Sequence, residues 1–454
     1  MSEGVDRKKR YVIRGGAPLR GTTRVPADKS IAHRALIFAA LADGRSIIRG
    51  FAAGRDNLAT AEIVRRLGVR VEIDGETARV DGVGLDGLTM PTVPLDCENS
   101  GTTMRLLAGV LAGQRFGARL VGDASLSGRP MMRVVGPLRA RGAHIAGVRG
   151  KKDGEQYPPL SIAPLISGER LIALEYRSPI ASAQVKSCLL LSGLYADGLT
   201  AIAEPIVSRD HTERAMRALG IPLETMGPMM VLDPTGWSRR WDGFEWTVPG
   251  DPSSAAFVIA AALLVPGSEV TVEGVGINPT RTGLFDALRA MRARLDVSAR
   301  GEAGCEPIGE LGVRAGSLAA TNVGGELLTR MIDEVPVFAA IASLARGRSD
   351  VRDASELRVK ESDRLATIAR VLAAFGADVT ELDDGLHVHG TRKLLGAHVA
   401  SEGDHRIAMS AAVLGMAAEG ETVVDDVACV ETSFPGFAEQ FVALGADLRV
   451  EDVP

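Results

Sequence analysis

The stretch LAAFGADVTEL, residues 372–382, joins an apolar helix end to a strand-like run through Gly376. The same phrase occurs five more times, as RRLGVRVEI (65–73), LRARGAHIA (138–146), MRALGIPLE (216–224), LRAMRARLDV (288–297) and FVALGADLRV (441–450). The junction residues recur at intervals of 69 to 84 positions and are Gly68, Gly142, Gly220, Arg292, Gly376 and Gly445. Glycine suits a helix end because it adopts the left-handed conformation at little cost. Arg292 breaks the pattern, so we expect the fourth copy to end its helix in another way.

A second repeated element alternates with the first, an apolar helix that begins at polar or glycine-bearing residues. The six expected starts are near Lys29, Ser100, Ser182, Pro252, Asp333 and Asp404. A helix that is apolar on nearly all sides belongs in a core. Between the helices, runs such as TARVDGV (77–83) and GLHVHG (385–390) alternate as half-covered strands do. Six such units exceed one domain core, so the sequence predicts two domains of three units.

The composition is that of a globular protein of 454 residues, 46% hydrophobic and 24% charged. Fifty-two Lys+Arg against 57 Asp+Glu give a net charge of −5, which disfavours general binding to nucleic acid or membranes but allows a local basic cleft. The most apolar stretch, residues 255–265, is too short to span a membrane. The basic start MSEGVDRKKR lacks the apolar segment of a secretion signal, so we expect a cytoplasmic protein. Four widely separated cysteines (Cys97, Cys188, Cys305 and Cys429) are expected to be reduced thiols.

Cations gather where the predicted helices begin, and helix N-termini favour anions. They are Lys29, Arg34, Arg105, Arg129, Lys186, Arg209, Arg281, Lys360, Arg364 and Arg406. For any one of them a salt bridge or a solvated cap is the better explanation. Their recurrence in most units favours a cleft between two domains that collects the anionic groups of a small substrate.

Acidic residues occur in the same places, and Asp251, Asp333 and Glu361 are candidates for general acid/base catalysis. The run Lys360-Glu361-Ser362-Asp363-Arg364 is expected to form one helical turn, with Lys360 and Arg364 on one face. A repeat scaffold that only binds partners is the alternative, but it has no need for carboxylates among these cations.

Several common sites are missing. Asp28 replaces the glycine that a phosphate-binding P-loop needs before Lys29, and the two glycines at 15–16 form no dinucleotide fingerprint. No Gly-x-Ser-x-Gly nucleophile elbow occurs. His387 and His389 share one face of a predicted strand, which fits a surface strand better than a metal site.

Ten motifs in order resemble the family of 5-enolpyruvylshikimate-3-phosphate synthases, over residues 11 to the C-terminus. They are KSIAHR (29–34), NSGT (99–102), GDASLSGRPM (122–131), SAQVK (182–186), SRDHTE (208–213), GDPSSAAF (250–257), NPTRTG (278–283), RVKESDRL (358–365), DHRIAM (404–409) and TSFP (432–435). SAQVK, RDHTE, GDPSS and NPTR together are similar to the class II branch.

The resemblance implies an α/β fold, a two-domain inside-out α/β barrel of six βαβαββ units, three per domain. One domain would comprise residues 1–22 with 249–454 and the other 23–248, with the active site in the cleft between them. The implied reaction transfers the enolpyruvyl group of phosphoenolpyruvate to the 5-hydroxyl of shikimate 3-phosphate and releases phosphate. The resemblance implies no metal or redox cofactor and a monomer, and the net charge predicts no nucleic acid or membrane partner.

Site residues also follow from the resemblance. The implied ligands of shikimate 3-phosphate are Lys29, Ser30, Arg34, Ser182, Ala183, Gln184, Arg209, Asp333 and Lys360. The implied ligands of phosphoenolpyruvate are Lys29, Gly101, Arg129, Gln184, Arg364, His405 and Arg406. Asp333 would accept the 5-hydroxyl proton, and Glu361 with Lys29 would handle protonation at the methylene carbon.

The chain departs from the family pattern at three positions. Thr432 stands where class I enzymes carry a lysine, and Ala183 where they carry a second serine. Gly101 stands where some glyphosate-tolerant members carry alanine, which implies sensitivity although the class II motifs imply tolerance. The alternative enzyme is a UDP-N-acetylglucosamine enolpyruvyl transferase, but no cysteine lies in the loop 122–131 where that family has one.

Overall fold

The computed structural model describes residues 9–51, 53–150 and 152–453, so most of the basic chain start lies outside the described residues. Contacts within the chain divide it into two compact units. Unit 1 comprises Met1–Pro26, Pro249–Gly301 and Pro307–Pro454, and unit 2 comprises Ala27–Val248 and Glu302–Glu306. The first boundary therefore lies four residues after the expected one at 22, and the segment 302–306 groups with unit 2 rather than with its neighbours.

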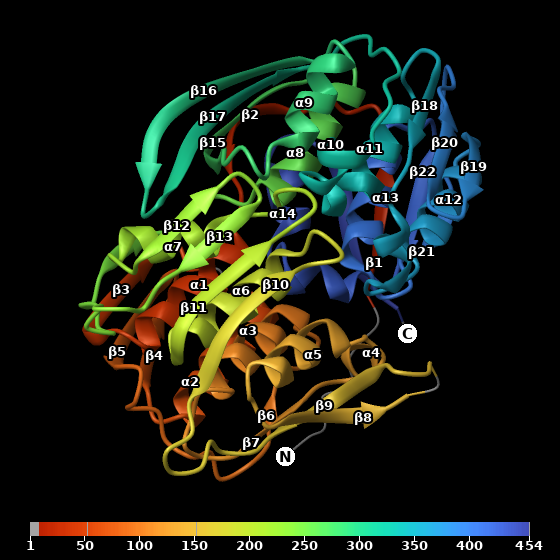
Figure 1. Ribbon diagram of the computed structural model, residues 1–454. Coiled ribbons are helices and arrows are strands. Elements are labelled where there is room, and N and C mark those ends of the chain that lie inside the picture. Colours follow the sequence, from red (N-terminus) through yellow and green to blue (C-terminus); the bar gives the residue numbers. More distant parts are fainter. Residues whose placement is uncertain (1–8, 52, 151, 454) are drawn as a thin grey trace. The chain divides into compact units, whose positions relative to one another are not determined.

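Unit 1 contains three sheets, with strand orders β21-β22-β1-β23, β16-β17-β15-β2 and β18-β20-β19 (Figure 1). Their strands are β1 (Lys9–Arg14), β2 (Arg20–Arg24), β15 (Glu269–Gly276), β16 (Arg294–Ala303), β17 (Glu306–Arg314), β18 (Arg348–Val351), β19 (Asp378–Leu382), β20 (Gly385–His389), β21 (His398–Ala400), β22 (Glu421–Asp425) and β23 (Asp447–Asp452).

Unit 2 contains three more sheets, with strand orders β14-β3-β5-β4, β6-β7-β9-β8 and β10-β11-β13-β12. Their strands are β3 (Asp43–Arg49), β4 (Arg70–Asp74), β5 (Thr77–Val83), β6 (Leu95–Asp96), β7 (Ala118–Val121), β8 (Ile145–Arg149), β9 (Gln156–Ile162), β10 (Leu171–Arg177), β11 (Ala196–Ala203), β12 (Leu223–Met226), β13 (Met229–Leu232) and β14 (Glu245–Thr247). The predicted strands at 77–83 and 385–390 are confirmed as β5 and β20.

Each unit has a core built on three buried helices. In unit 2 they are α1 (Lys29–Ala40), α3 (Gly101–Leu111) and α6 (Ala183–Gly193), and in unit 1 they are α8 (Pro252–Leu264), α11 (Val335–Ala342) and α13 (His405–Ala417). Their starts confirm the six predicted from sequence to within two residues. Polar N-caps fix most of these starts, because Asp28, Ser100, Ser182, Asp251 and Asp404 each accept a hydrogen bond from a backbone N–H of the first turn.

A half-exposed helix precedes each junction residue. These helices are α2 (Arg55–Arg66), α5 (Met132–Ala140), α7 (His211–Ala218), α9 (Gly283–Ala290), α12 (Arg364–Ala374) and α14 (Phe437–Ala443). Short helical turns complete the fold, namely α4 (Ala124–Ser127), α10 (Gly325–Thr329), η1 (Ile332–Glu334), η2 (Ser355–Val359) and η3 (Val427–Thr432).

The expectation for Arg292 is wrong. All six junction residues adopt positive φ, from 60° at Arg292 to 111° at Gly445. The N–H of Arg292 donates to Arg289 and that of Ala293 to Leu288, the same bonds that close the glycine-ended helices. These paired bonds fix the backbone at the junction, and the arginine adopts the left-handed conformation despite its side chain.

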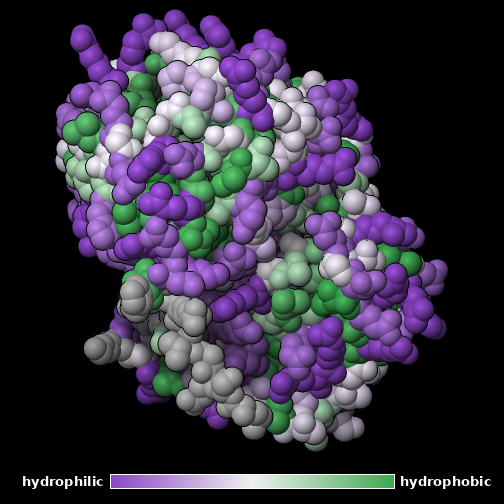
Figure 2. All heavy atoms as spheres, turned by 180° about the vertical axis from the view of Figure 1, so that it is seen from behind, coloured by the Kyte–Doolittle hydropathy of each residue, from purple (hydrophilic) through white to green (hydrophobic). Residues whose placement is uncertain are grey.

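The surface is polar over much of the face shown in Figure 2, with hydrophobic side chains gathered in smaller areas. Among the described residues, no helix combines the length and apolar character that crossing a bilayer requires. All four cysteines are free, and burial raises the pKa of the Cys188 thiol to about 12.

Candidate active site

In unit 2, most of the predicted site residues lie in the first turns of the buried helices, whereas Arg129 follows α4 and Arg209 precedes α7. Lys29 is the first residue of α1, and its Nζ lies 2.9 Å from Oδ2 of Asp56, in the first turn of α2. Arg34, one turn further along α1, is buried. Its Nε donates to Thr212 and its Nη2 to Ser187, so it joins α1 to α7 and α6. Burial lowers the pKa of Arg34 to about 10, which leaves its guanidinium charged at neutral pH.

A second contact group connects α3 and α6. Nη1 of Arg105 donates to Oε1 of Gln184 at 2.5 Å, and Nε2 of Gln184 donates to Thr102 at 2.9 Å. An alanine Cβ at Gly101 would lie 2.7 Å from Nη1 of Arg105 and 3.3 Å from Nη1 of Arg129. The position of Gly101 is thus close to both Arg105 and Arg129, and Arg105 in turn contacts Gln184.

Ser182 and Arg209 are supported from within the fold by buried charges. The carboxylate of Glu204 accepts hydrogen bonds from the backbone N–H of Ser182 and from Ser208, beside Arg209. Nζ of Lys186 lies 2.9 Å from Glu204 and 2.8 Å from Glu213, and these side chains are almost fully buried. Desolvation would lower the pKa of Lys186, but the two carboxylates outweigh it and raise that pKa. Lys186 therefore joins Glu204 to Glu213 and so supports the segments that carry Ser182 and Arg209.

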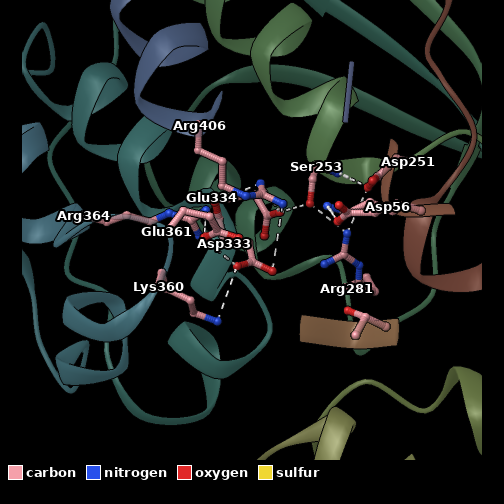
Figure 3. Close-up of polar contacts among 12 residues, drawn as sticks. Asp56, Asp251, Ser253, Arg281, Asp333, Glu334, Lys360, Glu361, Arg364 and Arg406 are labelled. Carbon is pink, nitrogen blue, oxygen red and sulfur yellow. Dashed lines mark hydrogen bonds and ion pairs between the residues drawn. The ribbon is translucent and has the colours of Figure 1, made fainter. Parts of the chain in front are cut away.

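In unit 1, Asp333 lies in η1, directly before α11, and three cations surround it (Figure 3). Its Oδ1 is 3.3 Å from Nη1 of Arg364 and 3.8 Å from Nζ of Lys360. Its Oδ2 is 4.0 Å from Nη2 of Arg406, whose Nη1 also donates to the Asp333 backbone carbonyl at 3.1 Å. Cations therefore lie near both oxygens of this carboxylate.

Arg364 is the centre of this group and is itself buried. Its guanidinium contacts Asp333, donates to Glu361 at 2.6 Å and donates to Asp404 at 2.8 Å. Burial disfavours the charged form, but Asp404, Glu361 and Asp333 outweigh it and raise the pKa of Arg364 above its ordinary value. Arg364 therefore stays charged and fixes the positions of both predicted acid/base residues.

The helical turn expected for residues 360–364 is not formed. The 3₁₀ turn η2 ends at Val359, and α12 begins only at Arg364. Asp363 accounts for this start, because its side chain accepts a hydrogen bond from the Ala366 backbone N–H as an N-cap. Lys360 and Arg364 nonetheless both reach Asp333.

His405 and Arg406 form the first turn of α13, behind the N-cap Asp404. Asp404 accepts hydrogen bonds from Ser362 and Arg364, and Arg364 holds its pKa below the usual range against the effect of burial. Asp404, which caps α13 and pairs with Arg364, is not among the predicted site residues. Its position before a cation pair at a predicted helix start is the signal that could have identified it.

Asp56 was also missed, although it lies in the first turn of a polar-faced helix and pairs with Lys29. Asp251, a candidate for acid/base chemistry, is the N-cap of α8 and pairs with Arg281 at 3.0 Å. His387 pairs with Asp350 at 2.7 Å on strand β20. Within the described ranges, no three His, Cys, Asp or Glu side chains cluster as a metal site would require.

Comparison with known proteins identifies the chemistry. The model of the family described as EPSP synthase (3-phosphoshikimate 1-carboxyvinyltransferase) matches residues 13–441. The chain belongs to the EPSP synthase family. Similar relatives named 3-phosphoshikimate 1-carboxyvinyltransferase are those of Geobacter sp. strain M21, 48% identical over 94% of this chain and 97% of the relative, and of Pelotomaculum thermopropionicum, 49% identical with the same coverage.

Solved structures agree with this assignment. An EPSP synthase from Acinetobacter baumannii matches with a TM-score of 0.86 and 39% identity, over 98% of this chain and all of that one. The enolpyruvyl transferase NikO from Streptomyces tendae matches with a TM-score of 0.79 at 20% identity, which shows the fold alone. The predicted enolpyruvyl transferase fold is confirmed. The reaction is transfer of the enolpyruvyl group of phosphoenolpyruvate to shikimate 3-phosphate, in aromatic amino acid biosynthesis.

Proposed function

We propose that Asp333 and Glu361 are the acid/base residues of this enolpyruvyl transfer. The observation that carries the proposal is their shared contact with the buried Arg364, because one fixed guanidinium holds both carboxylates in defined positions. Lys360 and Arg406 add positive charge beside Asp333. Such a group suits both anion binding and proton transfer.

In the proposed mechanism, Glu361 and Lys29 deliver a proton to the methylene carbon of phosphoenolpyruvate. Positive charge then develops at C2, and the 5-hydroxyl of shikimate 3-phosphate attacks it while Asp333 accepts the hydroxyl proton. The product of this step is a tetrahedral intermediate. Loss of phosphate from C2 and of a proton from the new methyl group restores the double bond. No step of this sequence requires an electron carrier.

The binding roles proposed for the site residues are those that the family resemblance implies. Lys29, Ser30, Arg34, Ser182, Ala183, Gln184, Arg209, Asp333 and Lys360 bind shikimate 3-phosphate. Lys29, Gly101, Arg129, Gln184, Arg364, His405 and Arg406 bind phosphoenolpyruvate. Planar guanidinium groups match carboxylate and phosphate oxygens in pairs, which a lysine ammonium cannot do.

The first test is phosphate release by the purified chain from the two substrates together. Asp333→Asn and Glu361→Gln are each expected to lower turnover by roughly 10²-fold or more. The matched control is Asp378→Asn, which changes an exposed carboxylate on β19. Near-normal turnover of either site variant would remove that residue from the mechanism.

A second test separates the two substrates. Arg129→Lys, Arg364→Lys and Arg406→Lys are expected to raise the KM for phosphoenolpyruvate more than that for shikimate 3-phosphate, and Arg209→Ala to do the reverse. Equal losses for both substrates would contradict this division of roles. We also propose that the chain acts as a monomer in the cytoplasm, and light scattering at assay concentration tests the monomer.

A further inference from the structure

The motifs GDPSS and NPTR carry buried polar residues that have no role in the proposed mechanism. Asp251, Ser253 and Arg281 come from these motifs, and each is at most 7% exposed. Nη2 of Arg281 donates to Asp251 at 3.0 Å and to Ser253 at 2.8 Å. Burying such charges is unfavourable unless they are paired, so the pairing calls for an explanation beyond helix capping.

The network continues to Glu334, the residue after Asp333. Ser253 donates its hydroxyl hydrogen to Oε1 of Glu334, which is itself 2% exposed. Oε1 of Glu334 lies 3.9 Å from Nη1 of Arg406. That same Nη1 donates to the backbone carbonyl of Asp333. Figure 3 shows these side chains in sequence, from Asp251 and Arg281 through Ser253 and Glu334 to Arg406.

The elements involved explain what such a network can do. Asp251 and Ser253 begin α8, Glu334 immediately precedes α11, and Arg406 begins α13. The network therefore connects the N-termini of the three buried helices of unit 1, and the proposed substrate-binding residues Asp333, His405 and Arg406 lie at two of them. Two carboxylates and two guanidinium groups alternate along it, so their charges balance.

We propose that Glu334, held by Ser253, is a positioning residue that fixes Arg406 for phosphoenolpyruvate binding. The inference rests on the proposed role of Arg406. Glu334 acts through Arg406 and does not contact the substrate. A guanidinium fixed in advance loses less freedom when the anion binds, which strengthens binding.

The charge of Glu334 allows a clear test, because two explanations of its role predict opposite changes in the KM for phosphoenolpyruvate. As a mere negative charge near Arg406, Glu334 repels an anionic substrate, and Glu334→Gln would lower the KM for phosphoenolpyruvate. As a positioning residue, it aligns Arg406, and Glu334→Gln raises that KM by about fivefold or more. The KM for shikimate 3-phosphate stays within about twofold, because the side-chain contacts described for Glu334 are with Ser253 and Arg406, and neither is a proposed ligand of that substrate.

Ser253→Ala provides a second route, because it removes the hydroxyl that holds Glu334 and keeps every charge. It is expected to raise the KM for phosphoenolpyruvate. In the double variant of Ser253→Ala with Glu334→Gln, the increase in this KM is expected to be smaller than the product of the two single increases, since both changes act through one contact. The control is Ser343→Ala, at a buried serine in the same unit whose hydroxyl donates only to the Ala340 carbonyl among the contacts described.

Thermal unfolding of every variant shows whether the fold is retained. An unchanged or lowered KM for phosphoenolpyruvate in folded Glu334→Gln would overturn the proposal. So would a double variant whose increase in this KM equals the product of the increases in Glu334→Gln and Ser253→Ala. If Glu334→Gln does not fold, the KM of Ser253→Ala for phosphoenolpyruvate tests the proposal instead, and an unchanged or lowered value would overturn it. Failure of the wild-type chain to release phosphate would instead overturn the function, and failure of Arg406→Lys to affect phosphoenolpyruvate would overturn the role of Arg406.

Discussion

His33 lies in α1 between Ser30 and Arg34, two residues proposed to bind shikimate 3-phosphate. Its side chain is 1% exposed, and Nδ1 shares a hydrogen bond of 2.8 Å with the Thr60 hydroxyl. Burial lowers the pKa of His33 to about 3, and the nearby cations Lys29 and Arg34 add to this effect while Asp56 opposes it. The folded chain therefore keeps this imidazole neutral.

His33 predicts a pH dependence of stability. In the unfolded chain a histidine binds a proton near pH 6.5. Between about pH 6.5 and 3 the unfolded state thus holds one more proton than the folded state. The free energy of unfolding falls as pH decreases through this window, by up to about 1.4 kcal/mol per pH unit from this residue. Above about pH 6.5 the contribution is constant.

Urea unfolding at pH 4.5, 5.5 and 6.5 checks this expectation. His33→Gln should show a shallower decrease in the free energy of unfolding toward acid than the wild type, whatever its stability at neutral pH. The control is His398→Gln, at an exposed histidine paired with Asp425, which should keep the wild-type slope. An unchanged slope in His33→Gln would show that His33 takes up its proton in the folded state too.

Gly101 carries a prediction about glyphosate, a competitor of phosphoenolpyruvate in the family this chain resembles. An added methyl would force Arg105 away, because it would lie 2.7 Å from Nη1 of that side chain, and would press on Arg129. Glyphosate is the longer ligand and loses more from a shortened pocket. We expect Gly101→Ala to raise the glyphosate inhibition constant more than the KM for phosphoenolpyruvate.

Steady-state inhibition assays measure both constants. Gly136→Ala is the control, since its methyl on α5 would meet only the Met132 Cε at 3.5 Å. We also expect the wild-type chain to be more sensitive than class II enzymes with alanine at this position. Wild-type inhibition as weak as theirs would mean that a position other than 101 causes glyphosate tolerance. Thr432, where a cation is missing, would be the next candidate.

At the level of single elements, the repeat predicted the helices well because each copy repeats the same local chemistry. Polar N-caps and left-handed junctions are local signals, so the starts of α1, α6 and α13 could be read from a few residues. The prediction of a helical turn at residues 360–364 was wrong, because charge spacing alone does not reveal that Asp363 caps a helix. Contacts such as that between Ser253 and Glu334 join positions 81 apart, and no spacing rule predicts them.

Arg292 gives a prediction at this scale. A non-glycine residue in the left-handed conformation costs about 1–2 kcal/mol, whereas glycine adds about 0.4–1 kcal/mol of unfolded-chain entropy. We expect Arg292→Gly to stabilise unit 1 by up to about 1 kcal/mol, measured by urea unfolding. The reverse change, Gly220→Arg, should destabilise unit 2 by a similar amount, since nothing lies within 4 Å of its Cβ position. A loss of stability in Arg292→Gly would show that the arginine side chain stabilises the junction.

At the scale of the whole molecule, the strands that precede α1 and α8 are exchanged between the units. Strand β2 comes before α1 in the chain but pairs with β15 after α8, and β14 comes before α8 but pairs with β3 after α1. Unit 2 is otherwise one continuous stretch, Ala27–Val248, with its own core. Unit 1 needs both ends of the chain.

Deletion of residues 1–26 is therefore expected to affect the two units differently. It removes β2 and also β1, which lies between β22 and β23, so the first sheet of unit 1 loses its inner strand. Limited proteolysis with mass spectrometry should show unit 2 still protected and unit 1 cut. Deletion of residues 1–8, which removes neither strand, is the control. Equal protection of both units would contradict the importance of these strands.

The pairing of β1 with β23 also has a consequence for the newly made chain. Arg10 and Glu451, joined by hydrogen bonds across this pair, are 441 positions apart in sequence. During synthesis, all of the continuous stretch of unit 2 has been translated when nearly half of the chain is still to be made. Strand β1, the first of unit 1, cannot pair with β23, the last strand of the chain, until synthesis is nearly complete. Until β22 and β23 have been made, β1 has neither of its partner strands and is an unpaired strand that chaperones can bind. The order in which the two units fold therefore follows from the order of translation.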